Sequence, residues 1–242
     1  MDISPQTPAL PAQNALIEAH DLQFEVVGAA GRVNILRGVD LAICSGEVVG
    51  VVGPSGSGKT SLLMLLAGLD RPTGGSLTVA GHALAGMDED ALARFRRDEV
   101  GIVFQGFHLV PTMTALENVA MPLEFAGVAD AFERAEAALV SVGLGHRIGH
   151  YPGQLSGGEQ QRVAVARAFV ALPKLILADE PTGNLDRATG AQVMKLLFDL
   201  RGEYGTTLLL ITHDPDLAAR CDRVLRMEDG RLVADDALVA AQ

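Results

Sequence analysis

The chain has 242 residues, of which 48% are hydrophobic and 4% aromatic, and its formal net charge is −11. This length suits a single α/β domain, and the aliphatic composition suits a buried parallel sheet. The negative charge argues against a general nucleic-acid binder, because such a protein needs a basic face to neutralise phosphates. No apolar stretch approaches the ~20 residues of a membrane-spanning helix, and no signal peptide is evident, so we expect a cytoplasmic protein.

The first part of the chain predicts strands that open a domain and then a strand–turn–helix unit. Residues 1–15 are rich in Pro, Ala and Gln, so we expect a disordered tail before one domain at 16–242. Alternating and apolar runs predict the next elements in chain order: antiparallel strands at 16–27 and 33–43, a buried strand at 46–53, a helix at 60–69, a strand at 76–81, a helix at 88–98 and a strand at 100–105.

The second part predicts a mostly helical insertion at about 106–170, followed by a return to strands. Phe132, Ala135, Leu139 and Val142 recur at helical spacing, and Gly143 stands where a C-terminal cap would. Further elements follow to the end of the chain: strands at 174–179 and 206–214, a helix near 187–201 between them, and a closing hairpin at 223–235. The fold class is therefore α/β, with a parallel core, an antiparallel part and a helical insertion.

Residues 53–60 read GPSGSGKT and fit the phosphate-loop pattern G-x-x-x-x-G-K-[ST] between an apolar strand and a helix. The glycines let backbone N–H groups curl around an anion, and the helix N-terminus adds its positive end. The lysine supplies a charge for the β- and γ-phosphates, and the threonine offers a hydroxyl to Mg²⁺. The sequence therefore predicts a nucleoside triphosphate site made by Gly53, Pro54, Ser55, Gly56, Ser57, Gly58, Lys59, Thr60 and Ser61.

A phosphate loop of this kind needs a metal-ordering carboxylate at the end of a neighbouring strand. The run LILADE at 175–180 supplies Asp179 and Glu180 after four apolar residues. We expect Asp179 to bind Mg²⁺ and Glu180 to orient or deprotonate the attacking water. Adjacent carboxylates are also common as solvated turn residues, and the phosphate loop is what favours the functional interpretation.

Three more polar residues follow strand ends and are candidates for the same site. Gln105 ends the run VGIVFQ and is a candidate ligand for Mg²⁺ or water. His213 ends the run LLLITH and is a candidate donor to the γ-phosphate, and Asp186 lies just beyond the carboxylates. A lone glutamine or histidine at a strand end is more often structural, so this alternative stays open on the residues alone.

Residues 155–161 read LSGGEQQ and begin an apolar helix. Ser156, Gly157 and Gly158 form either a second anion-binding nest or a plain serine N-cap followed by a glycine turn. Together, GPSGSGKT, Gln105, LSGGEQQ, LILADE, NLD and His213 resemble the ATP-binding subunit of ABC transporters over residues 16–235. LSGGEQQ is similar to the signature sequence of that family.

This resemblance implies an ABC ATPase fold, a P-loop core with two smaller parts, and a homodimer closed around two ATPs with Mg²⁺. The signature loop of one subunit then faces the nucleotide bound by the other, which explains why one chain carries two phosphate-binding patterns. The matched residues imply phosphate or Mg²⁺ binding for Gly58, Lys59 and Thr60, and catalysis for Glu180. They also imply a γ-phosphate contact for His213 and a link to the partner for Gln105.

The chain departs from the family at the residue that stacks on adenine. The family has an aromatic residue upstream of the phosphate loop, and the corresponding position here falls near Val26, with Phe24 the only aromatic nearby. We therefore expect weak stacking and loose base selectivity.

Residues 104–122 and 178–186 are similar to the ATPases of bacterial lipoprotein-releasing and macrolide-exporting systems. That resemblance implies an integral membrane permease with a large periplasmic domain as partner, and a location on the cytoplasmic face of the inner membrane. The candidates for a permease-binding groove are Phe107, Leu109, Val110 and Met113, which have packing of the helical insertion as an equal alternative.

Two further functions remain open at this point. One is an ATPase that signals to a membrane regulator without transport, as in cell division. The other is a member of the superfamily that acts on DNA or ribosomes. The short distance between Lys59 and Asp179 and the presence of only one such domain argue against the second.

Overall fold

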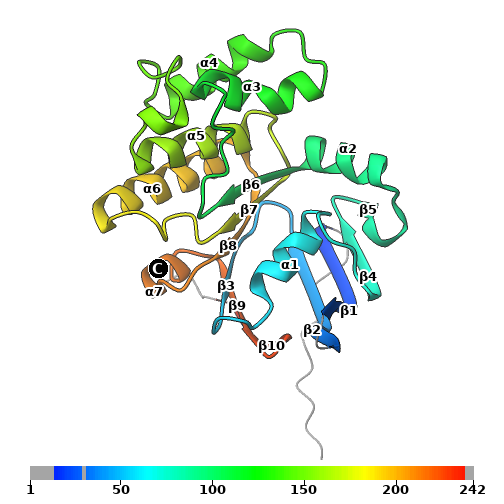
Figure 1. Cartoon of the computed structure of the whole chain (residues 1–242). Coiled ribbons are helices and arrows are strands. Elements are labelled where there is room, and N and C mark those ends of the chain that lie inside the picture. Colours follow the sequence, from blue (N-terminus) through cyan, green and yellow to red (C-terminus); the bar gives the residue numbers. More distant parts are fainter. Residues whose placement is uncertain (1–13, 29–30, 238–242) are drawn as a thin grey trace, which may run out of the picture.

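The computed structural model describes residues 14–28 and 31–237 and folds them around two sheets (Figure 1). The expected disordered tail at 1–15 lies outside the described residues, apart from Asn14 and Ala15. Ala15 already begins the first strand. The extent of such a tail therefore stays a prediction.

The central sheet has six strands in the order β10-β9-β3-β8-β7-β6. Five of them are parallel, and β10 pairs with β9 in the antiparallel sense. The strands are β3 (Val48–Val52), β6 (Val100–Phe104), β7 (Leu175–Asp179), β8 (Thr207–Ile211), β9 (Arg223–Glu228) and β10 (Arg231–Ala237). Because parallel strands end at the same edge, the polar residues that follow β3, β7 and β8 are brought together there.

The second sheet is antiparallel and has the order β2-β1-β4-β5. Its members are β1 (Ala15–Gly28), β2 (Gly31–Cys44), β4 (Gly74–Val79) and β5 (His82–Ala83). The two long strands β1 and β2 pair along almost their whole length, with shifts of register near Leu22 and Phe24. This confirms the two predicted antiparallel strands.

Most of the helices lie in the part of the molecule away from the antiparallel sheet (Figure 1). Between β6 and β7 the chain forms α3 (Ala115–Phe125), α4 (Ala131–Ser141), the 3-10 turn η2 (Pro152–Gln154) and α5 (Gly157–Phe169). The other helices are α1 (Lys59–Leu66), the 3-10 turn η1 (Leu84–Gly86), α2 (Glu89–Glu99), α6 (Arg187–Tyr204) and α7 (Pro215–Ala218). No described helix has the length and apolarity to cross a membrane.

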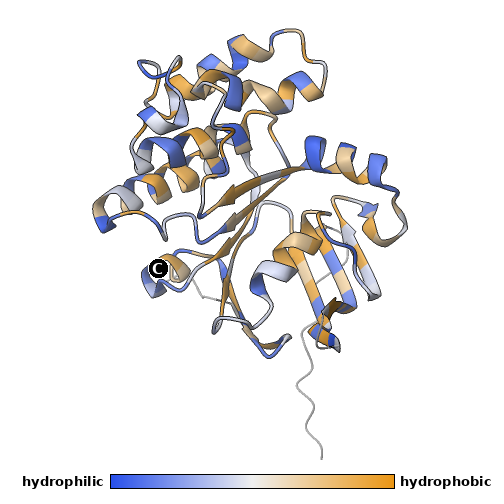
Figure 2. Ribbon diagram, viewed as in Figure 1, coloured by the Kyte–Doolittle hydropathy of each residue, from blue (hydrophilic) through white to orange (hydrophobic). Residues whose placement is uncertain are grey.

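The central sheet separates two apolar cores, and alternate residues of one strand enter different cores. In β8, Leu209 and Ile211 pack with α1 and the antiparallel sheet, whereas Leu208 and Leu210 pack with the helices on the other face. Burial on both faces explains why these strands are continuous apolar runs, and Figure 2 shows the central strands as mainly hydrophobic. The fold class predicted from the sequence is confirmed.

Two local predictions have different outcomes. The closing hairpin is confirmed: Asp229 and Gly230 turn between β9 and β10 with φ of 48° and 74°, as a tight two-residue hairpin turn requires. The predicted apolar stripe of α4 is wrong at Phe132, whose side chain is 43% exposed. The buried face uses Ala131 with Ala135 and Leu139, because small side chains let α4 approach α3 closely.

Candidate functional site

The phosphate loop connects the end of β3 to the start of α1 in the conformation that its glycines permit. Gly53 has φ 150°, and a Cβ at this position would overlap the carbonyl oxygen of Met227. Gly58 has φ 99°, and a Cβ there would lie 2.8 Å from Cδ2 of Leu36. Both positions therefore require glycine, for backbone conformation and for lack of space.

A cavity of about 360 Å³ opens in front of this loop. Its walls are formed by Ile35, Ser55, Gly56, Gly58, Lys59, Thr60, Ser61, Asp179, Glu180 and Ile211. The structure thus brings most of the predicted phosphate-loop residues together with both predicted carboxylates. Gly53 and Pro54 complete the loop, and Nζ of Lys59 donates hydrogen bonds to their carbonyl oxygens at 2.9 and 2.8 Å.

Ser57 lies inside the loop and is buried, at 2% exposure. Its hydroxyl has no hydrogen-bond partner among the described residues. A buried polar group normally has a partner, so this hydroxyl fits a loop built around an anion. The lysine ammonium and the N-terminus of α1 provide further positive potential at the same place.

Asp179 lies at the end of β7 and accepts a hydrogen bond from the hydroxyl of Thr60 at 3.0 Å. Burial raises the pKa of the Asp179 carboxyl, and the neighbouring Glu180 raises it further, while Thr60 and Lys59 act in the opposite direction. A hydroxyl and a carboxylate side by side are oxygen donors of the kind that Mg²⁺ prefers. These two residues therefore fit a magnesium ion that also binds phosphate and water.

Glu180 follows directly and has a left-handed backbone, with φ 44°. Its amide donates to Ile211 O at 3.0 Å and its carboxylate pairs with Nδ1 of His213 at 3.3 Å. The Glu180 side chain is 30% exposed and that of His213 is 74% exposed. Both side chains thus remain accessible at the carboxyl edge of the sheet.

Gln105 does not line the cavity, although it follows β6 as predicted. Its amide nitrogen donates to Oδ1 of Asn184 at 3.1 Å, and the Asn184 amide donates to the Gln105 carbonyl at 3.0 Å. A Cβ on Gly183 would lie 2.6 Å from Nε2 of Gln105, so the loop after the carboxylates packs closely on this side chain. A role in binding Mg²⁺ stays a prediction.

Ser156 caps the N-terminus of α5 in a capping box. Its hydroxyl donates to the Glu159 carboxylate at 2.9 Å, and the Glu159 amide lies 3.3 Å from the same hydroxyl. These bonds from Ser156, together with Arg147, hold the pKa of Glu159 below its usual value. The serine is therefore an N-cap in this chain, and the helix that it begins starts with the half-buried Gly157 and the buried Gly158.

The signature residues and Asp186 do not line the phosphate-loop cavity. Asp186 caps α6 by accepting from the amides of Ala188 and Thr189, and the side chain of Thr189, followed by these amides, lowers the pKa of the Asp186 carboxyl. A Cβ on Gly158 would overlap Cγ2 of Thr189, so the starts of α5 and α6 lie against each other. The phosphate loop and the signature residues are thus spatially separate groups within one chain.

Sequence reasoning missed Ile35 and Ile211, which line the cavity, and Asn184, which holds Gln105. The two isoleucines are ordinary strand residues in the sequence, so no local signal distinguishes them. Near the expected adenine position, Val26 is 44% exposed, whereas Phe24 packs against the core that lies between α1 and the antiparallel sheet. The Phe24 side chain therefore contacts this core, which leaves less of its ring for stacking on adenine.

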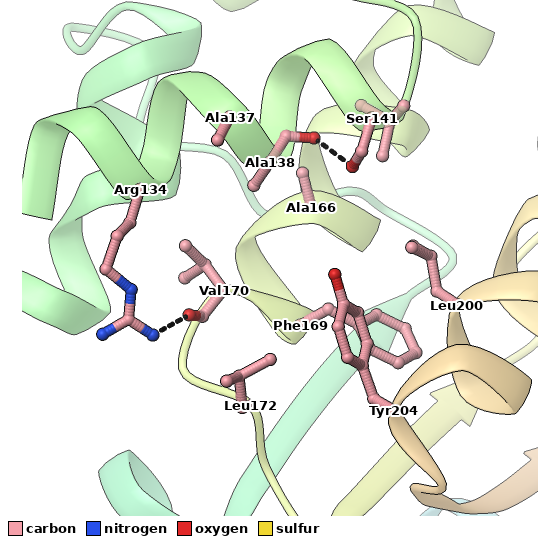
Figure 3. A pocket seen from close by; sticks show the side chains of 11 residues that line it. Arg134, Ala137, Ala138, Ser141, Ala166, Phe169, Val170, Leu172, Leu200 and Tyr204 are labelled. Carbon is pink, nitrogen blue, oxygen red and sulfur yellow. Dashed lines mark hydrogen bonds between the residues drawn. The ribbon is translucent and has the colours of Figure 1, made fainter.

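A second hollow of about 290 Å³ lies among α4, α5 and α6 and shares no residue with the first (Figure 3). Its walls are mainly apolar, and the rings of Phe169 and Tyr204 lie with their centroids 6.1 Å apart. At its edge Arg134 donates to the carbonyl of Val170 at 3.1 Å. It carries none of the predicted site residues.

Residues 36–183 match the family model described as ABC transporter. The chain belongs to this family. The ABC transporter ATP-binding protein YbbA of Escherichia coli (strain K12), itself named as uncharacterised, is 51% identical over 225 residues, which cover 92% of this chain and 98% of that protein. The lipoprotein-releasing system ATP-binding protein LolD of Geobacter metallireducens is 48% identical, covering 92% of this chain and all of that protein.

Longer and structural relatives agree with this assignment. The pyoverdine export ATP-binding/permease protein PvdT of Pseudomonas fluorescens (strain Pf0-1) is 47% identical, and this chain spans 35% of its length. A solved dimer of the ATP-binding cassette MJ0796, in a post-hydrolysis state with ADP and Pi, superposes with a TM-score of 0.85. The two chains are 38% identical, and the superposition covers 93% of this chain and all of the MJ0796 chain.

This protein is therefore an ATP-binding and ATP-hydrolysing subunit, the motor of an ABC transporter, as the sequence predicted. Its family acts through dimers of the cassette and with a membrane permease. The similarity to the lipoprotein-releasing subfamily is confirmed. A role in signalling without transport is not favoured.

Proposed function

We propose that this ATPase acts as a homodimer that encloses two ATPs, each between the phosphate loop of one copy and the signature residues of the other. The observation that carries the proposal is the separation of the two sets. Ser156, Gly157 and Gly158 present a helix N-terminus that takes no part in the cavity of their own chain. The solved dimer of the cassette MJ0796 with ADP and Pi supports the assembly of two copies.

The residues of the cavity divide the work on ATP and Mg²⁺. The loop amides and Lys59 bind the phosphates, in exchange for the bonds that Lys59 now makes to loop carbonyls. Thr60 and Asp179 would hold Mg²⁺, which would supply positive charge beside the phosphates. Glu180, whose backbone is left-handed, orients and deprotonates the attacking water.

Three more residues complete the site from positions outside the cavity wall. His213 contacts the γ-phosphate, and its present pairing with Glu180 keeps both groups at the same edge. Gln105 responds to the nucleotide through Asn184, to which it is hydrogen-bonded, and Asp186 binds at the site from its place at the N-cap of α6. ATP must bind the closed dimer more tightly than the open one to drive this cycle.

The partner is an integral membrane permease with a large periplasmic domain, which places the ATPase on the cytoplasmic face of the inner membrane. The names of LolD and PvdT, a lipoprotein-releasing and an export protein, support a permease of this type. We assign its binding to the groove residues Phe107, Leu109, Val110 and Met113, which are all half-buried. Leu109 also packs against the core on the helical face of the central sheet.

We also propose the domain limits expected from the sequence, one ATPase domain at 16–242 with a helical part at about 106–170. The position of α3, α4 and α5 between β6 and β7 supports this division. Helix α5 packs against β6, and this packing joins the helical part to the central sheet.

The variant Ser156→Arg tests the shared site. We expect it to abolish ATP-induced dimers in size-exclusion chromatography while binding of ATP to a single chain persists in equilibrium dialysis. The larger cationic side chain fills the space of the partner's phosphate, whereas the phosphate loop of its own chain is unchanged. Ser76→Arg, at an exposed position of β4, is the matched control. Loss of monomer binding together with the dimer would contradict the proposal.

A further inference from the structure

The segment between β6 and α3 contains a turn that the chain does not favour by itself. Phe107 and His108 are consecutive non-glycine residues with φ of 59° and 49°. Left-handed conformations cost roughly 1–2 kcal/mol for each such residue. The surroundings must therefore hold this turn in place.

Arg167, in the last turn of α5, holds it with both ends of its guanidinium. Nη1 donates to His108 O at 2.7 Å and Nη2 donates to Phe107 O at 3.0 Å. The guanidinium is largely buried, which lowers its pKa. A planar fork that meets two successive carbonyls fixes both the position and the orientation of the turn, which a lysine cannot do.

The same helix contacts this segment at two more places. Gln161 is fully buried, and its side-chain amide donates to Phe104 O at 3.2 Å. At the start of α5, a Cβ on Gly157 would lie 3.6 Å from Cζ of Phe107. The segment 104–108 is thus attached to α5 from its signature residue Gly157 to its last turn.

A second attachment comes from the loop after β7, where Asn184 binds Gln105 through two hydrogen bonds. The segment 104–108 therefore lies between two elements, the helix that begins with the signature and the loop that follows the carboxylates Asp179 and Glu180. Gln105 joins it to the loop, and Arg167 joins it to the helix.

We propose that Arg167 is a positioning residue that makes the segment 104–108, and the permease groove that begins at Phe107, move with the signature helix. The inference rests on the proposed function, because it assigns a mechanical role to closure of the signature on the partner's ATP. When Arg167 is lost, Gln161 still bonds Phe104 to α5, but the carbonyls of Phe107 and His108 lose their hydrogen bonds to that helix. Closure of the dimer then no longer displaces Phe107 and Leu109.

The test is amide hydrogen exchange, followed by mass spectrometry, on the full chain with and without Mg²⁺ and the non-hydrolysable analogue AMP-PNP. In the wild type we expect nucleotide to slow exchange in two peptides, 156–162 and 104–110. In Arg167→Met the first peptide keeps this response and the second loses it. The basal exchange of 104–110 becomes faster by about tenfold or more, as loss of hydrogen bonds to a charged group predicts.

Two variants serve as controls. Arg134→Met removes a similar bond from an arginine to a loop carbonyl, that of Val170, in the same helical part (Figure 3). We expect it to leave the response of 104–110 intact. Arg167→Lys keeps the charge without the fork and should restore part of the response. This variant decides the matter if Arg167→Met does not fold in circular dichroism.

The possible results separate the two levels of inference. If 104–110 responds to nucleotide in both Arg167 variants as it does in the wild type, Arg167 is not the coupling residue. If Arg134→Met also loses the response, the effect is a general loosening and the specific role is wrong. If neither peptide of the wild type responds to nucleotide, the shared site of the proposed function fails first, and the coupling fails with it.

Discussion

The hydroxyl of Thr60 donates to the carboxylate of Asp179 at 3.0 Å, although the two residues are 119 positions apart. This bond joins the first turn of α1 to the end of β7 across the carboxyl edge of the central sheet. The Asp179 carboxylate is partly buried, where the charged form is less stable than in water, and burial accordingly raises the pKa of this group.

The first prediction concerns this cost. An acid whose pKa is raised on folding destabilises the folded state above that pKa, and the penalty disappears as pH falls through it. Asp179→Asn should therefore raise the melting temperature of the nucleotide-free protein at pH 7 by about 2–4 °C, equivalent to about 1 kcal/mol. It should also abolish the effect of Mg²⁺ on ATP binding. Calorimetry at pH 7 and pH 3.5 checks this, since the gain should shrink at the lower pH.

The second prediction concerns Glu180 and its pairing with His213 at 3.3 Å. Glu180→Gln keeps the size of the side chain but cannot accept a proton from water. We expect ATP turnover to fall by a factor of about 10² or more while ATP binding persists and a stable dimer accumulates. Phosphate release and light scattering measure the two effects. Normal turnover in this variant would show that another group is the base, and Glu203→Gln on the exposed end of α6 is the control.

The third prediction separates packing from phosphate binding at the signature. Gly158→Ala introduces a Cβ that overlaps the methyl group of Thr189, so it should destabilise the fold by about 1–3 kcal/mol. Thr189→Ala removes that methyl and should restore most of the loss in the double variant. Urea unfolding of the four proteins gives the coupling energy. An equal loss with and without Thr189 would mean that the strain lies elsewhere.

The fourth prediction follows from the capping box at the start of α5. The pKa of Glu159 is held low by Ser156, so its carboxylate stabilises the folded state above its unfolded pKa of about 4.5. This contribution is lost as pH falls through the lower, folded value. The wild type should therefore be more stable than Glu159→Gln at pH 7, and the difference should shrink as pH falls below 4.5. Urea midpoints across this range test it, and a constant difference would exclude the charged cap.

The fifth prediction concerns the two thiols. Burial raises the pKa of Cys221 to about 12, and its sulfur lies 3.6 Å from Leu217 O. Only the thiolate reacts with alkylating reagents, so iodoacetamide at pH 8 should modify the half-buried Cys44 and spare Cys221. Both should react in urea. Mass spectrometry of Cys44→Ser, which should remain unlabelled in the native state, provides the control.

Much of the site could be predicted because its chemistry lies in contiguous residues. The phosphate loop needs a strand, a glycine-rich turn and a helix start in succession, and all three lie within residues 46–69. The carboxylates follow a short apolar strand, and parallel strands end at one edge. The pairing of Thr60 with Asp179 could thus be expected from the order of elements alone.

Other parts of the site depend on residues that carry no local mark. Ile35 and Ile211 form cavity walls only because the first half of β2 and the end of β8 lie beside the phosphate loop. The partners of Arg167 are backbone carbonyls, which every residue possesses, so no sequence pattern predicts which ones it meets. Phe132 illustrates the same limit, since helical spacing alone did not tell which face of α4 would pack on α3.

The sequence by itself determined the parallel core, the phosphate loop and the serine-capped helix start at 156–158, because short-range conformation and side-chain type specify them. The family resemblance already implied that the signature residues lie away from the phosphate loop of their own chain, whereas only the tertiary structure decided that α5 is tied to the segment 104–108. These relationships arise from the packing of elements far apart in the chain. Such packing depends on the fit of whole surfaces, which no single stretch of residues encodes.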